Sequence, residues 1–66
     1  MKITKTIAKD PITGIESEVW TVVYKTEEKT VLEAMTDVPE TSMSYCYDGA
    51  DKGKVKVYDG TNWVEQ

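Results

Sequence analysis

Two pairs of carboxylates and one thiol are the side chains whose types and spacing best suit acid–base or nucleophilic chemistry in this 66-residue sequence. The pairs are Glu16 with Glu18 and Glu27 with Glu28, and the thiol belongs to Cys46. A nucleophile needs a base beside it, and the sequence has no histidine, the most frequent base. So small a domain also offers little room for the desolvated cleft that a carboxylate pair requires. The sequence therefore predicts that the protein is not an enzyme and uses no cofactor.

An acidic, glycine-rich segment at residues 48–53 has some features of a calcium-binding loop. Its third and fifth ligand positions would be Ala50 and Lys52, however, and no bidentate glutamate follows at position twelve. With no histidine and one cysteine, the Cys/His zinc spacings are impossible as well. Since Asp and Gly are ordinary hairpin residues, we expect a turn here and no metal site.

The charge balance argues against nucleic acid as a partner. Eight lysines and twelve acidic residues give a formal net charge of −4, and arginine is absent. A phosphate-binding surface needs clustered positive charge, and arginine is the best bidentate ligand of phosphate and guanine.

Membrane and export signals are also missing from the pattern. No apolar run approaches the length of about 20 residues that spans a bilayer, and the N-terminus lacks the apolar core of a signal peptide. We expect a protein made in the cytosol, without a membrane partner and not secreted by a signal peptide.

A chain of this length holds one domain, residues 1–66, with a small core. Such a domain buries about 60% of the surface that its unfolded chain exposes, and small scaffolds usually recover stability through disulfides, a structural metal or oligomerisation. Cys46 has no second cysteine to pair with. Self-association, or docking on a larger assembly, is the remaining route.

Period-two alternation predicts a hairpin in the first part of the chain. Residues 2–9 suit an edge strand whose lysines discourage edge-to-edge pairing. Residues 10–14 combine Asp, Pro and Gly in a turn. The second strand, about residues 15–26, is apolar on both faces, which indicates that its second face is covered too.

A short helical turn is predicted near residues 31–36. Thr30 to Glu33 matches the capping-box pattern, and Pro39 ends the helix. Two turns are too few to be stable alone, so Leu32 and Met35 must pack on the sheet.

Alternation returns in the last third of the chain and predicts strands near residues 42–47, 54–58 and 63–65. We expect Val55 and Val57 to face inward. A four-residue loop should place Val57 opposite Val64 and Tyr58 opposite Trp63. The predicted fold is mainly β: a small antiparallel sheet of about five strands, made of two hairpins plus a connecting strand, with one short helical turn.

Six aromatic residues are many for so short a chain. Tyr and Trp favour places with one apolar and one wet side, which include both small-domain cores and interfaces. Alternation puts Tyr58 and Trp63 on the face away from the expected core. We therefore take these two, with Asn62 between them and Trp20 on the second strand, as the candidate contact surface. If the other side of that strand faces outward, Val19 and Val23 replace Trp20.

The C-terminal half resembles small proteins encoded in bacteriophages and prophages, often near head genes. The resemblance rests on the turn Asp37-Val38-Pro39, on a strand that ends in Asp48, and on the hairpin Tyr58-Asp59-Gly60-Thr61-Asn62-Trp63. It covers about half of the chain, and residues 1–28 contribute no match. A hairpin of this kind also occurs in phage tail proteins and carbohydrate-binding modules.

The resemblance implies a virion or virion-assembly protein that acts by contact with itself or with other phage structural proteins, first in the bacterial cytoplasm and then in the particle. Two other classes stay open. A carbohydrate-binding module would use Trp20, Trp63 or a tyrosine as a stacking platform beside Asn62 and Asp59. A phage-encoded regulator would bind one host protein.

Overall fold

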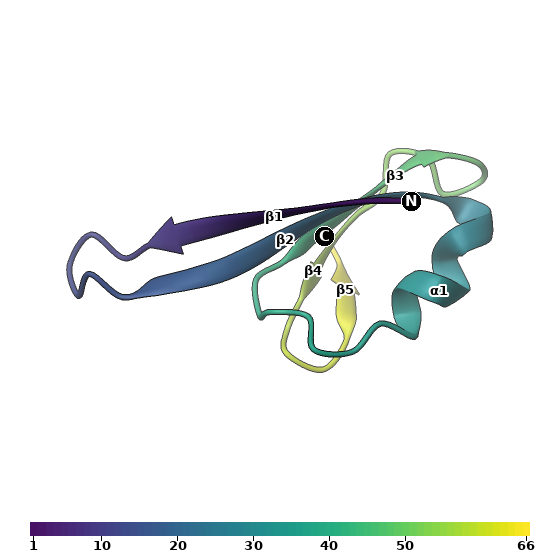
Figure 1. The fold of residues 1–66 in the computed structure, drawn as a ribbon. Helices are drawn as coiled ribbons and strands as arrows, with labels where there is room; N and C mark the ends of the chain where they lie inside the picture. Colours follow the sequence, from purple (N-terminus) through teal and green to yellow (C-terminus); the bar gives the residue numbers. More distant parts are fainter.

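The computed structural model describes all residues, 1–66, as a five-stranded sheet with a short helical segment on one face (Figure 1). The strands lie in the sheet in the same order as in the chain. They are β1 (Lys2–Lys9), β2 (Glu16–Lys25), β3 (Met43–Asp48), β4 (Val55–Tyr58) and β5 (Trp63–Glu65), with a 3-10 turn η1 (Thr26–Glu28) and helix α1 (Lys29–Glu33) between β2 and β3. The mainly β fold of five strands with one short helical element is confirmed.

The sheet is mixed, which corrects the expectation of a purely antiparallel one. β2 and β3 run parallel, with Thr21 beside Met43 and Tyr24 beside Cys46, while the other three strand pairs are antiparallel. The reason is the long connection through η1 and α1. It carries the chain back along the sheet, so that β3 starts level with the middle of β2 and runs in the same direction.

The helical segment starts earlier than the capping-box pattern predicted. It begins at Thr26, where the backbone N–H of Lys25 donates to Glu28 Oε1 at 3.0 Å, so Glu28 makes the reciprocal contact that was expected of Glu33. The helix ends at Glu33, well before Pro39. The predicted boundaries, 31–36, were therefore too late in the chain.

The register of the last hairpin is the one that loop length predicted. Val57 pairs with Val64 and Tyr58 pairs with Trp63 across the loop at residues 59–62. A four-residue connection leaves only one way for the two strands to meet.

The core lies on one side of the sheet, between the sheet and α1. Leu32 of α1 packs there, and Met35 beyond the helix leans on the same cluster, as expected. The fully buried members of the cluster are Val22, Tyr24, Leu32 and Cys46, with Met35 and Trp63 packed against them. Only eight of the 66 residues are buried in all, so the core is small and one-sided.

We call the side of the sheet that packs on α1 the inner face and the opposite side the outer face. Tyr58 and Lys56 lie on the inner face, and Val55 and Val57 lie on the outer face. The expectation that these two valines face inward was wrong. Alternation separates the two faces of a strand but does not say which one a helix will cover.

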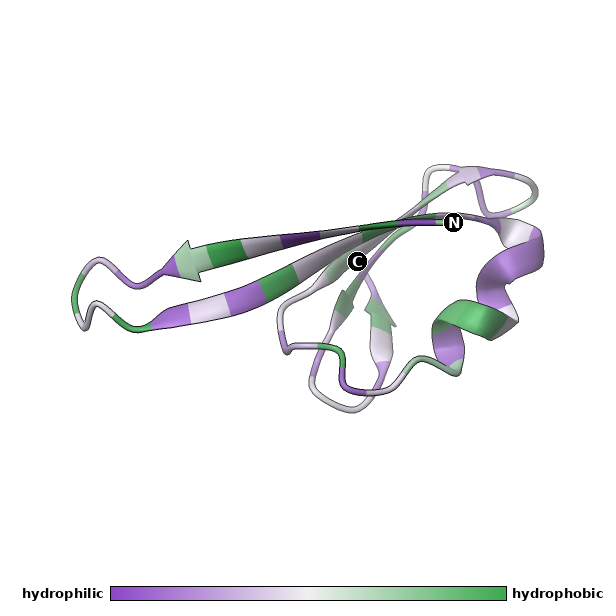
Figure 2. Cartoon of the chain, in the orientation of Figure 1, coloured by the Kyte–Doolittle hydropathy of each residue, from purple (hydrophilic) through white to green (hydrophobic).

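The first hairpin extends beyond the rest of the molecule as an arm, residues 6–19 (Figures 1 and 2). β3 pairs with β2 only from Thr21 onward, so the arm is a two-stranded ribbon. Its apolar side chains are the most exposed in the chain, with Ile12 at 93%, Ile15 at 66% and Ile7 at 59%. The arm raises the radius of gyration to 12.5 Å, against about 10.8 Å for a compact domain of this length.

Candidate functional site

Tyr58 and Trp63, the centre of the predicted contact surface, belong to the inner face. Tyr58 is 8% exposed, and its hydroxyl donates to the carbonyl of Thr61 at 3.2 Å. Trp63 is half-buried, and its Nε1–H donates to the carbonyl of Leu32 at 3.2 Å. The prediction that this pair faces outward was wrong, because α1 covers the side on which the pair lies.

Tyr58, Asn62 and Trp63 nevertheless come together around one cavity. Glu33 and Thr61 complete its lining, and its volume is about 230 Å³. Pockets for drug-sized ligands usually measure about 300–1,000 Å³. The buried ring of Tyr58 and the half-buried ring of Trp63 also leave little open aromatic face for a sugar to stack on.

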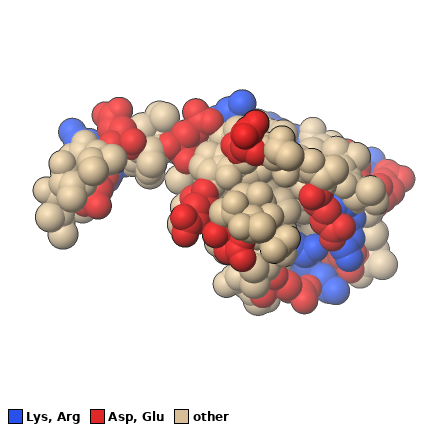
Figure 3. Space-filling model, turned by 90° about the horizontal axis from the view of Figure 1, so that it is seen from below, with Lys and Arg blue, Asp and Glu red and all other residues tan.

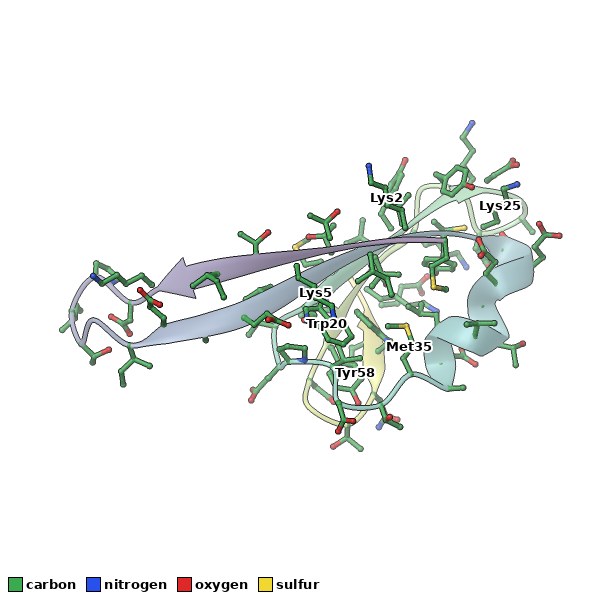
Figure 4. All side chains as sticks on the ribbon, viewed as in Figure 1. Lys2, Lys5, Trp20, Lys25, Met35 and Tyr58 are labelled. Carbon is green, nitrogen blue, oxygen red and sulfur yellow. The ribbon has the colours of Figure 1, made fainter.

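Trp20 lies on the same inner face as Tyr58, at the base of the arm (Figure 4), but it does not line this cavity. Lys5 Nζ lies 4.6 Å from the centroid of its ring, its Nε1–H donates to Glu18, and its backbone N–H donates to Ser42 Oγ at 3.0 Å. A cation–π contact at such a site contributes about 0.5–1 kcal/mol. The polar atoms of Trp20 are thus engaged within the chain, where they hold the arm to the loop before β3.

Cys46 is a packing residue of the core. It is fully buried, and its Sγ lies 3.2 Å from the carbonyl of Asp48 and 3.4 Å from Thr26 Oγ1. Thr26 Oγ1 also donates to the same carbonyl and accepts from the backbone N–H of Asp51, both at 3.0 Å. This network fastens the end of β2 to the loop between β3 and β4.

Three lysines surround a second small cavity, of about 220 Å³, on the same side as α1. Acidic partners accompany them: Lys54 Nζ lies 3.2 Å from Asp51 Oδ1 and 3.5 Å from Glu65 Oε1. The hydrogen bond that Lys54 donates to Asp51, and next the charge of Glu65, raise the pKa of Lys54 above its ordinary value. The positive charge of the cluster is therefore largely compensated within the chain.

The outer face was not part of the predicted contact surface, except for the alternative pair Val19 and Val23. Its side chains come from all five strands, and neither α1 nor a loop covers them: Met43 is 47% exposed, Val64 44% and Tyr45 42%. By strand register, its neutral residues are Thr4, Thr6, Ala8, Ser17, Val19, Thr21, Val23, Met43, Tyr45, Val55, Val57 and Val64.

Charged residues are concentrated on the covered inner face of the sheet and are rare on the uncovered outer face. Up to the register shift after Tyr24, thirteen residues lie on the outer side, and Lys2, at its margin, is the charged one among them. Beyond the shift, Lys25 follows Tyr24 on the outer side and pairs with Asp48. The inner side holds fifteen, of which six are charged, namely Lys5, Lys9, Glu16, Glu18, Lys56 and Glu65. Figure 3 shows acidic side chains over the underside of the molecule, the side of α1. A sheet with one solvated face normally carries its polar residues there, so the outer face has the composition of a covered surface.

Comparison of the chain with family models, with curated proteins and with solved structures found no match. No helix is long and apolar enough to cross a membrane, and no three His, Cys, Asp or Glu side chains are grouped so as to hold a metal ion. The sequence indicated part of the outer face, because the second strand is apolar on both of its sides.

Proposed function

We propose that the protein is a non-catalytic structural or assembly protein of a phage particle, and that it acts through protein–protein contact. The observation that carries this proposal is the outer face, with twelve neutral residues on the uncovered side of the sheet. Burial of apolar surface contributes about 25 cal/mol per Å², so a protein cover over this face is favourable. The resemblance of the C-terminal hairpin to phage proteins supplies the setting.

The size of the core supports the same proposal. Eight buried residues on one side of a sheet make a small core, and Cys46, the single cysteine, forms no disulfide. Domains of this size commonly obtain further stability from assembly. A protein bound in many copies to a particle would obtain it there.

Of the two other classes, only the carbohydrate-binding module would use a different surface. A carbohydrate-binding module would use the cavity beside Trp63 and Asn62, whose aromatic rings are largely packed within the chain. A regulator of a host protein would use the outer face, as an assembly protein would. The experiment must therefore separate the partners as well as the surfaces.

Mass spectrometry of purified particles from a host that carries the gene tests the proposal. We expect the protein in the particles in many copies, and its absence from them would overturn the structural role. Titration with a glycan panel, followed by tryptophan fluorescence, is expected to give no response. Capture of one host protein in stoichiometric amount, together with absence from particles, would favour the regulator instead.

A matched pair of variants tests the surface. Met43→Lys places a charge in the middle of the outer face, whereas Val31→Lys changes a 58% exposed side chain on α1. Both variants are expected to fold, as checked by circular dichroism, but only Met43→Lys should be missing from particles. Equal incorporation of the two variants would contradict the role of the outer face.

A further inference from the structure

We infer that the cavity beside Trp63 binds the ammonium group of a lysine side chain that a partner protein presents. The cavity is lined by Glu33, Tyr58, Thr61, Asn62 and Trp63, and it lies on the inner side of the sheet, where α1 ends. The inference goes beyond the proposed function, which rests on the outer face.

The hydrogen-bonding groups that remain free in this cavity are mostly acceptors. The hydroxyl of Tyr58 already donates to the carbonyl of Thr61, and the Nε1–H of Trp63 donates to a carbonyl of α1. The carboxylate of Glu33 can only accept hydrogen bonds. The hydroxyl of Thr61 and the amide of Asn62 can each turn an oxygen toward a donor. A ligand that brings several N–H donors and no acceptor matches these walls.

Glu33 supplies a negative charge that forms no ion pair within the chain. The three ion pairs of the structure use Glu28, Asp51 and Glu65 as their acidic partners. Glu33 is also the last residue of α1, at the end of a helix where positive charge is favoured, and the last turn holds no basic residue. The lining contains no lysine, whereas the second small cavity has three. A cation from outside the chain would therefore complete the site.

Two aromatic rings favour a cation over a neutral donor. Tyr58 and Trp63 both line the cavity, with their ring centroids 5.1 Å apart. A cation within about 6 Å of a ring centroid gains about 0.5–1 kcal/mol at exposed sites and about 2 kcal/mol when it is desolvated. A sugar needs an open ring face to stack on, whereas an ammonium group is a compact charge that needs only to come close to the ring.

The size of the cavity indicates that the ammonium group is the end of a longer side chain. Its volume of about 230 Å³ is below the range of about 300–1,000 Å³ for drug-sized ligands. A water molecule takes about 30 Å³, so there is room for an ammonium group, its last methylenes and a few waters. Lysine carries its ammonium on a flexible four-carbon stem, which can enter while the partner stays outside. The net charge of −4 and the acidic side chains on this side (Figure 3) attract a basic partner.

A nuclear magnetic resonance titration of the full chain tests the inference, because the two tryptophans give separate indole N–H signals. The probe is Nα-acetyl-lysine N-methylamide, and the matched control is the norleucine derivative, which has the same four-carbon stem without the ammonium. We expect the Trp63 signal to shift saturably, with a dissociation constant in the millimolar range. The signal of Trp20, which does not line the cavity, should stay in place. The norleucine derivative should shift neither signal.

Two variants with the same change of net charge locate the site. Glu33→Gln removes the carboxylate charge but keeps an oxygen acceptor, and it should weaken binding about tenfold. Glu16→Gln, on the arm and outside the cavity, should leave the affinity unchanged. Equal shifts at both tryptophans, equal binding of the norleucine derivative, or full affinity in Glu33→Gln would overturn the inference.

These outcomes are independent of those for the outer face. A protein that is found in particles but whose cavity ignores the lysine probe would sink this inference and leave the proposed function intact. A saturable response in a protein that is absent from purified particles would do the reverse.

Discussion

Tyr58 and Trp63 meet edge to face across the β4–β5 hairpin, with ring centroids 5.1 Å apart and ring planes at 63°. The indole of Trp63 also donates to the carbonyl of Leu32, a residue 31 positions earlier in the chain. One cross-strand pair therefore ties the last hairpin to α1. This pair contributes to the core rather than to a contact surface.

Removing the indole of Trp63 should strongly destabilise the folded protein. Trp63→Ala is expected to lower the free energy of unfolding by about 3 kcal/mol, because it removes a large, half-buried side chain and its partner ring loses its edge contact. Trp63→Phe keeps a ring but loses the hydrogen bond to Leu32, at about 1 kcal/mol. Urea denaturation measures both. Val64→Ala on the outer face serves as the control, and an equal loss there would contradict the packing of Trp63 against the core.

Gly49 is the glycine whose replacement should be most damaging. Its φ is +97°, and an added Cβ would lie 2.4 Å from Thr26 Oγ1, whereas Gly60 has a similar φ of +102° and open space around it. Gly49→Ala should therefore cost at least about 1 kcal/mol more stability than Gly60→Ala, because only the former adds a steric clash to the backbone strain. Thermal or urea unfolding of the two variants gives the difference directly. Equal losses would show that Thr26 moves aside freely.

The hydroxyl of Tyr24 is buried and has no hydrogen-bond partner. Tyr24→Phe should leave stability at neutral pH unchanged or raise it by up to about 1 kcal/mol, because an unsatisfied polar group is removed. A marked loss of stability in this variant at neutral pH would show that the hydroxyl has a partner.

Alkaline unfolding gives a second measurement on the same residue. Burial, and next the charge of the Cys46 thiolate, raise the pKa of Tyr24 above its ordinary value of 10.0. A raised pKa means that the folded state retains the proton, so the stability from the neutral phenol is complete below pH 10 and is lost as pH rises through the folded pKa. Wild type should lose stability above about pH 10 more steeply than Tyr24→Phe, as followed by urea midpoints.

Asp59 should make the last hairpin sensitive to acid. The backbone N–H groups of Asn62 and Thr61 donate to its Oδ1 at 2.7 and 2.8 Å and lower its pKa below the ordinary value of 3.8. A lowered pKa gives stability that is present above pH 3.8 and is lost as pH falls through the folded pKa.

Two substitutions separate the charge of Asp59 from its hydrogen bonds. Asp59→Asn keeps an oxygen acceptor without a titrating group, so its stability should fall less between pH 4 and pH 2 than that of wild type. Asp59→Ala loses the turn hydrogen bonds at every pH and should be less stable throughout. An acid limb of unchanged steepness in Asp59→Asn would assign the acid sensitivity to other carboxylates.

Local patterns in the sequence were sufficient for the strands and for one register. Alternation located all five strands within a few residues, and the four-residue loop at 59–62 determined that Val57 meets Val64. The helix was found, but its start was misplaced, because a Thr-to-Glu pattern at residues 30–33 competed with the contact that Glu28 makes to the backbone of Lys25. Strand alternation, turn length and helix capping can be predicted from a sequence because each depends on residues only a few positions apart.

The direction of β3 and the choice of inner and outer face were decided by tertiary structure alone. The strand around Met43, Ser44 and Tyr45 alternates equally well whichever side is buried, and Tyr58 and Trp63 fit a core as well as an interface. The position of α1 decides which side is buried, because Leu32 of α1 packs on Val22 and Cys46. By itself, the sequence determined which residues share a face. Only the packing of a distant segment decided which face is covered and which is left free for a partner.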